Sequence, residues 1–138
     1  MKKAMLIMFA IILASCSPKF YETSNVLNFQ DYTGKDFIIN PTSVSNGDFE
    51  PLGTISNYFH IGKPGKGDEH KVTERTHKSF GNVYHDGYDV SFEYMMKKTI
   101  QDAKNIGANG IIEFKILDIM NKNVRIGYRM EGTAVKFK

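Results

Sequence analysis

Residues 89–112 read DVSFEYMMKKTIQDAKNIGANGII, and this stretch decides the fold. Its apolar residues recur at spacings of two to four, whereas charged and amide side chains lie mostly on the opposite side. This pattern is typical of an amphipathic helix with one buried face. We expect the helix from about Asp89 to Ile106, with Asp89 as its N-cap. Gly107 follows the last apolar position, where a left-handed residue commonly ends a helix.

The residues after this helix predict two strands joined by a turn. Residues 108–119 alternate, so that Ile112, Phe114 and Ile116 share one face, and Asn121-Lys122-Asn123 can reverse the chain. A last strand is expected from Val124 to about Phe137. We expect two sets of small residues to allow close packing of the helix end and the last strand, namely Gly107 and Ala108, and Gly132, Thr133 and Ala134.

The first half of the chain predicts further strands and a long loop or hairpin arm. A short strand is expected over Asp36–Asn40, a turn-rich segment after Pro41, and a long, bulged strand over residues 49–61. Residues 62–87 predict an exposed loop, or a hairpin arm over Lys71–Tyr84. The expected fold class is α+β: a small antiparallel sheet with one long helix in a β-α-β-β core, plus N-terminal strands and this loop or arm.

The N-terminus carries the features of a bacterial lipoprotein signal. Met1-Lys2-Lys3 precedes an apolar run that is too short to span a bilayer, and Leu13-Ala14-Ser15-Cys16 follows it. We expect residues 1–15 to be a signal peptide, with a lipid on Cys16 that anchors the protein to a membrane. Residues 16–35 are then a tether or docked N-terminal arm, and residues 36–138 a single domain.

The expected location is the bacterial cell envelope. Ser17 follows the lipidated position, rather than the aspartate associated with retention at the inner membrane, which favours the outer membrane facing the periplasm. Cys16 is the only cysteine, so the mature domain has neither an internal disulfide nor a thiol catalyst.

Composition excludes some partners. Without Lys2 and Lys3, 16 of the 18 basic side chains remain against 15 acidic ones, and they are scattered along the sequence. This near balance argues against nucleic acid as a partner. Ten Phe and seven Tyr without any Trp favour a strand-rich protein.

Three segments resemble a known family: Phe92-Glu93, AKNIGANGII at 103–112, and EGTAVK at 131–136. They are similar to the YbjQ-like family, labelled heavy-metal-binding domains with dodecin-like subunits. The resemblance implies a strand-helix-strand-strand subunit that assembles into a ring, often a pentamer. Its motif residues here are Gly107, Ala108, Asn109, Gly132, Thr133 and Ala134. This sequence departs from the family at Gly110, where Ala is usual, in the long 62–87 insertion, and in its lipoprotein signal.

The family label and the loop residues suggest a metal site as one possibility. The candidate ligands are Asp68, His70, His77, His85 and Asp86. No His-x-x-x-His pair lies on a predicted helix, and the spacings match no zinc or calcium loop, which favours solvated loop histidines. The glycine-rich Gly62–Gly67 segment lacks the Gly-Lys-(Ser/Thr) ending of a phosphate loop and predicts a flexible turn.

Two functions follow from the sequence. The first is a non-catalytic, lipid-anchored envelope protein that self-assembles and offers a surface to a protein or glycan partner, with no cofactor beyond the covalent lipid. The second is a periplasmic protein that binds a divalent metal ion or a small ligand through the histidine and acidic loop. We expect no enzymatic activity, because no catalytic constellation is recognisable.

Overall fold

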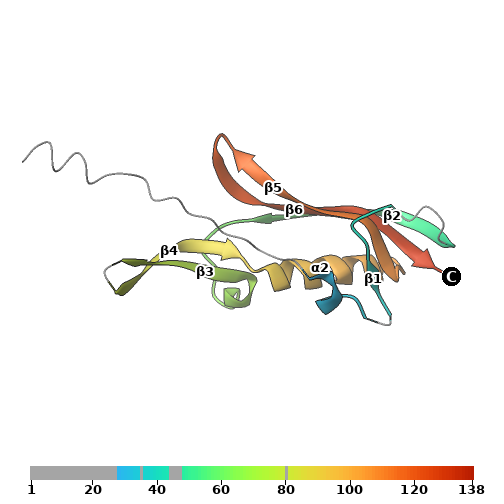
Figure 1. Ribbon diagram of the computed structural model, residues 1–138, viewed down its shortest axis with the longest axis horizontal. Helices are drawn as coiled ribbons and strands as arrows, with labels where there is room; N and C mark the ends of the chain where they lie inside the picture. Colours follow the sequence, from blue (N-terminus) through green and yellow to red (C-terminus); the bar gives the residue numbers. More distant parts are fainter. Residues whose placement is uncertain (1–27, 35, 44–47, 80) are drawn as a thin grey trace, which may run out of the picture.

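The computed structural model describes residues 28–34, 36–43, 48–79 and 81–138, with the side chains of 77–79 excepted. Cys16, the signal peptide and most of the expected tether lie outside the described residues. The elements are η1 (Phe29–Asp31), β1 (Ile38–Ile39), β2 (Phe49–His60), η2 (Glu69–Lys71), β3 (Val72–Ser79), β4 (Asn82–Val90), α2 (Phe92–Asn105), β5 (Gly110–Asn121) and β6 (Val124–Phe137). The expected α+β class is confirmed: one helix lies with a four-stranded sheet and a separate hairpin (Figure 1).

The four-stranded sheet has the order β1-β5-β6-β2 and is mixed. Both long pairings, β5–β6 and β2–β6, are antiparallel as expected. The short β1 instead runs parallel to β5, with Ile38 opposite Gly110 and Ile39 opposite Ile111. Strand direction depends on which neighbour a strand lies beside, so the sequence of a two-residue strand could not indicate this.

Helix α2 begins three residues later than predicted. Ser91 is the N-cap, and its hydroxyl accepts a hydrogen bond from the backbone N–H of Tyr94 at 3.4 Å. The predicted cap, Asp89, belongs to β4 and directs its carboxylate to β6. The predicted helix end is confirmed, because Gly107 has a φ of 87°.

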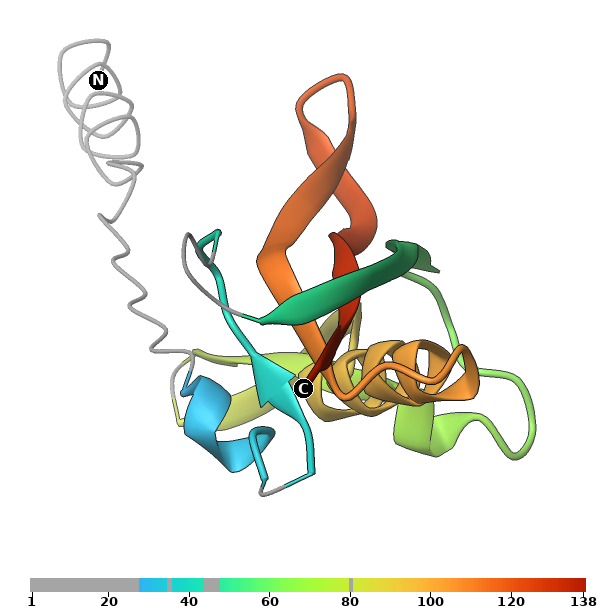
Figure 2. The same ribbon diagram turned by 90° about the vertical axis from the view of Figure 1, so that its right-hand side faces the viewer.

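The helix covers one face of the sheet, and the outer half of the β5–β6 hairpin projects away from it (Figure 2). Met95, Met96 and Ala103 of α2 are buried against Ile111 of β5 and Met130 of β6. The N-terminal segment joins this core through aromatic rings. Phe29 and Tyr32 make edge contacts with Phe114 and Phe92, at ring-centre distances of 5.8 and 6.0 Å.

Bulges set which residues of the long strands face the helix. In β2 the expected irregularity lies between Pro51 and Gly53. In β5 the register shifts between Ile112 and Lys115, around Glu113 with a φ of 55°. The extra residue moves Ile111 and Phe114 to the core face. The expected grouping of Ile112 with Phe114 and Ile116 is therefore wrong, because strict alternation ignored the bulge.

The small residues of the C-terminal half lie where backbones approach closely. A Cβ atom on Gly132 would lie 2.6 Å from Ile111 Cγ2 and 3.0 Å from the Ile112 carbonyl oxygen. Ala108 and Ala134 are buried, while the Thr133 hydroxyl lies at the surface, 3.5 Å from a Glu113 carboxylate oxygen. The Asn109 side chain accepts from Phe137 N at 2.7 Å and donates to Phe137 O at 3.1 Å.

Candidate functional site

Strands β3 and β4 form an arm, residues 72–90, that extends from the start of α2 (Figure 1). Their antiparallel ladder runs from Val72 opposite Val90 to Ser79 opposite Asn82. The expected hairpin is thus present, and it continues six residues beyond Tyr84, the predicted end. The arm's two-stranded sheet is separate from the sheet of the domain.

The base of the arm is fixed to the domain by packing and by charge. Val90, the last residue of the arm, is 8% exposed. Lys71 precedes the arm and Ser91 follows it, and the backbone N–H of Ser91 donates to the Lys71 carbonyl oxygen at 2.8 Å. The Asp89 carboxylate accepts from the Tyr128 hydroxyl at 3.0 Å and from Arg125 at 3.3 Å, both on β6. Because opposite charges and a hydrogen bond join β4 to β6, the direction in which the arm leaves the domain is set.

Tyr128 provides a test of this attachment, because burial and the hydrogen bond to the Asp89 carboxylate raise its pKa from 10.0 to about 12. A raised pKa stabilises the folded protein fully below pH 10, and this contribution is lost as pH rises through 12. In ultraviolet titrations of phenolate, we expect the difference between the parent protein and Tyr128→Phe to have its midpoint near 12.

Tyr58→Phe supplies the control for this titration. Tyr58 is exposed, and hydrogen bonds with Ser56 and Arg129 lower its pKa below 10.0. The Tyr58 difference curve should therefore have its midpoint below that of an ordinary tyrosine. A Tyr128 curve with a midpoint at or below 10 would contradict the attachment through Asp89.

The arm and β2 both present open strand edges. Within the described part of the chain, β3 and β4 pair only with each other, and β2 pairs only with β6. Unpaired backbone N–H and C=O groups on such edges are ready to pair with another strand. A two-stranded hairpin is also only marginally stable by itself. Val83, near the arm's turn, is 59% exposed, which adds apolar surface to the open backbone.

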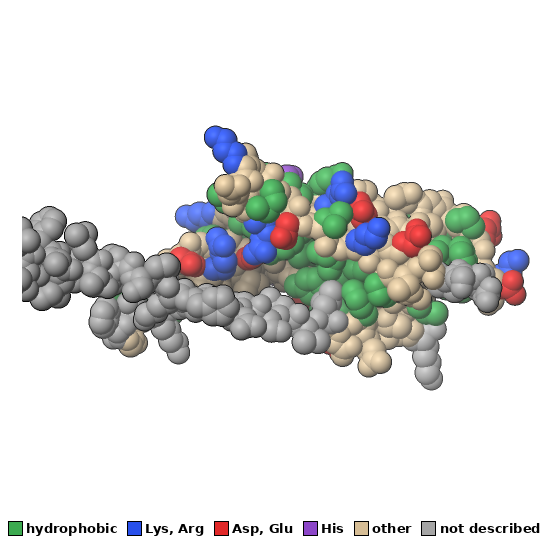
Figure 3. Space-filling model, turned by 45° about the horizontal axis from the view of Figure 1, so that its top comes forward, with side chains coloured by type: hydrophobic (Ala, Val, Ile, Leu, Met, Phe, Trp, Pro, Cys, Tyr) green, Lys and Arg blue, Asp and Glu red, His purple; other side chains and the backbone are tan. Residues whose placement is uncertain are grey.

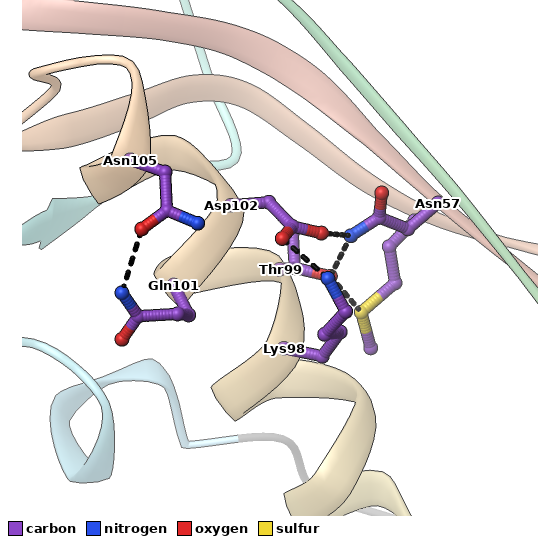
Figure 4. A network of polar contacts seen from close by, with 7 residues as sticks. Asn57, Lys98, Thr99, Gln101, Asp102 and Asn105 are labelled. Atoms are coloured by element: carbon purple, nitrogen blue, oxygen red, sulfur yellow. Dashed lines mark hydrogen bonds and ion pairs between the residues drawn. The ribbon is translucent and has the colours of Figure 1, made fainter.

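A partly buried polar network, which the sequence patterns did not indicate, holds β2 on the helix (Figure 4). Asn57 of β2 donates from Nδ2 to Thr99 Oγ1 at 3.2 Å and to Asp102 Oδ2 at 3.0 Å. Lys98 pairs with Asp102, and the Thr99 hydroxyl donates to Met130 Sδ at 3.3 Å. The network joins residues more than 30 positions apart and connects β2 and β6 to the helix.

The predicted metal ligands do not form a ligand group in the described residues. Asp68 pairs with Lys71 at 2.7 Å, which lowers the carboxyl pKa, and His70 lies edge-on to Tyr94. The rings of His85 and Tyr88 lie edge to face with their centres 4.7 Å apart, and the neighbouring Asp86 is exposed in β4. The backbone of His77 lies in β3 opposite Tyr84, but its side chain is outside the described part.

Consistent with these positions, no three His, Cys, Asp or Glu side chains gather as metal ligands across the described ranges. The metal site remains a prediction. On the face shown in Figure 3, acidic and basic side chains are interspersed. Among the helices of the described part, none has the length and apolar character needed to cross a membrane.

The architecture is thus an α+β domain with a hairpin arm. No family model matches the sequence, and no curated protein gives a match. Among solved structures, the chain is similar to a crystal structure of a protein of unknown function that belongs to the DUF74 family, from Pediococcus pentosaceus. The identity is 11%, the match covers 74% of this chain and 98% of the other, and the TM-score is 0.37. At these values the similarity assigns neither a family nor an activity.

Proposed function

We propose that the protein is a non-catalytic, lipid-anchored protein of the bacterial envelope whose domain self-assembles through its arm. The observation that carries the proposal is the arm itself: two strands that, among the described residues, pair only with each other, with open edges and an exposed apolar residue near the turn. The lipoprotein signal ending at Cys16 supports the anchoring, with the outer membrane facing the periplasm as the expected location. The assembled surface would serve a structural role or bind a protein or glycan partner.

Strand addition is the interaction that these edges favour. An arm strand of one copy can extend the sheet of a second copy along its open β2 edge, with main-chain hydrogen bonds giving affinity. Such a contact joins two different surfaces, so repeated copies close into a ring when the rotation between them allows it. This agrees with the ring, often a pentamer, that the YbjQ-like sequence resemblance implies.

The first test is the absolute mass of the chain from Ser17 onward, which retains every described residue. Light scattering on a sizing column, with and without zinc, should give one discrete oligomer whose mass does not depend on the metal. A monomer at high concentration would contradict self-assembly. A monomer that assembles only with zinc would favour the alternative, metal binding by the histidine and acidic loop, and changing His70, His77 and His85 to Ala should then abolish zinc binding.

The arm's role is tested by Val83→Glu. Val83 is 59% exposed, so a glutamate is tolerated within the arm, whereas it places a charge in an apolar contact between copies. We expect the concentration needed for assembly to rise by about tenfold or more, the effect of roughly 1.4 kcal/mol. Val124→Glu is the matched control, because Val124 is 65% exposed near the tip of the other hairpin. Equal effects of the two changes would exclude the arm as the contact.

A further inference from the structure

A pocket of about 270 Å³ lies where the arm joins the domain. Its lining residues belong to the end of β2, the loop that follows β2, the base of the arm and the start of α2. Phe59, Val90 and Tyr94 give it an apolar floor. Phe59 and Val90 are each 8% exposed, and the rings of Phe59 and Tyr94 meet edge to face at 6.1 Å. The floor is therefore apolar and partly aromatic.

The rim of the pocket carries an excess of positive charge. Asp68 is the one acidic side chain among the described lining residues, and it is already paired with Lys71. The same Lys71 ammonium lies 5.7 Å from the centre of the Tyr94 ring, which further fixes its position. Lys63 lies on the rim with no side-chain partner in the described part of the chain. One lysine charge is thus left for an anion.

The loop between β2 and η2 also offers backbone donors. Within the described ranges, the N–H groups of Gly62, Lys63 and Gly65 donate to no protein acceptor. Tyr58 and His60, at the end of β2, also line the pocket. An aromatic floor with a few convergent polar groups is the usual composition of a small-molecule site, and the volume suits about one sugar ring.

We propose that this pocket binds an acidic monosaccharide, with its carboxylate on Lys63 and the loop amides and its ring on Phe59 and Tyr94. A neutral sugar would leave the Lys63 charge unused, and a small anion without a ring would leave the apolar floor exposed. The inference rests on the proposed function, since it names the chemistry of a glycan partner. The binding is measured on the protein whether or not it assembles, so either proposal can fail alone.

The experiment is an NMR titration of the chain from Ser17 onward with D-glucuronate. D-glucose, which has the sugar ring without the carboxylate, and acetate, which has the carboxylate without the ring, are the comparison ligands. We expect saturable shifts at the Gly62–Gly65 and Tyr94 amides, with a Kd of about 1 mM, as suits a ligand of this size. Glucose and acetate should each bind at least about tenfold more weakly. No saturation by about 10 mM glucuronate, or equal binding of glucose, would overturn the proposal.

Two lysines of the same loop give a matched pair of variants. Lys63→Met removes the charge on the rim, and we expect it to weaken glucuronate binding by about tenfold. Lys66→Met removes the same charge from an exposed residue that does not line the pocket, and it should leave the affinity unchanged. Both side chains are exposed, so thermal unfolding should stay the same in both variants. Equal weakening by the two changes would show general charge attraction and would overturn the site.

Discussion

Replacing Gly127 with Ala should lower the free energy of unfolding by about 3 kcal/mol, at the upper end for an added methyl group in a packed interior. A Cβ atom at this position would lie 2.2 Å from the Phe59 carbonyl oxygen and 3.2 Å from His60 Cα. Both contacts are backbone atoms of the neighbouring strand β2, so no side-chain rotation can relieve them. The ladder between β2 and β6 would have to separate at the point where Gly127 lies opposite His60.

Urea unfolding followed by circular dichroism measures this change, at one fixed protein concentration because assembly would add to the apparent stability. Gly62→Ala is the control, because a Cβ atom there meets no heavy atom within 4 Å. We expect the control to stay within about 0.5 kcal/mol of the parent protein. A Gly127→Ala variant as stable as the Gly62→Ala variant would contradict the close approach of β2 and β6.

Met130→Ala should also lower the free energy of unfolding by about 3 kcal/mol, since it leaves a cavity between the sheet and the helix. Met130 is 0% exposed and lies opposite Asn57 of β2 and Ile116 of β5. Its sulfur accepts the hydrogen bond of the buried Thr99 hydroxyl. The substitution therefore removes both apolar contacts and the acceptor of a buried polar group.

Met120→Ala makes the same chemical change on the same hairpin and serves as the control. Met120 is 52% exposed, so its truncation should change the free energy of unfolding by no more than about 0.5 kcal/mol. The difference between the two variants isolates the effect of burial. Similar values for both would mean that the core does not centre on the contact of α2 with β6.

Gly127 and Met130 lie outside the arm and do not line the pocket, although the clash at Gly127 is with Phe59 and His60, which do line it. Gly127 and Met130 belong to β6, whereas Val83 and Lys63 are exposed residues of the arm and of the loop before it. Lys63→Met should change ligand affinity without changing the unfolding of the domain. Val83→Glu should change the assembled mass, and it should lower the apparent stability only by the part that assembly contributes. The two sets of measurements can therefore separate the function of the protein from its folding.

Local sequence determined the elements of the C-terminal half. The 14-residue helix, its end at Gly107 and the last strand from Val124 to Phe137 follow from apolar spacing and from turn residues. These signals depend on neighbours within a few positions, so they can be interpreted without knowledge of the fold. The long β2 strand with its bulge was predicted for the same reason, whereas the hairpin after it was one of two alternatives, the other being an exposed loop.

Only the tertiary structure decided how these elements meet. The parallel pairing of β1, the bulge at Glu113 that reorients β5, and the contact of Asp89 with β6 depend on residues far apart in the sequence. The same holds for the pocket, which combines Phe59, Lys63 and Tyr94 from three segments. Hydrophobic periodicity indicates which side chains are buried, but it does not indicate the partner against which each one packs. The candidate sites of this protein lie at such long-range contacts, so the sequence patterns could not locate them.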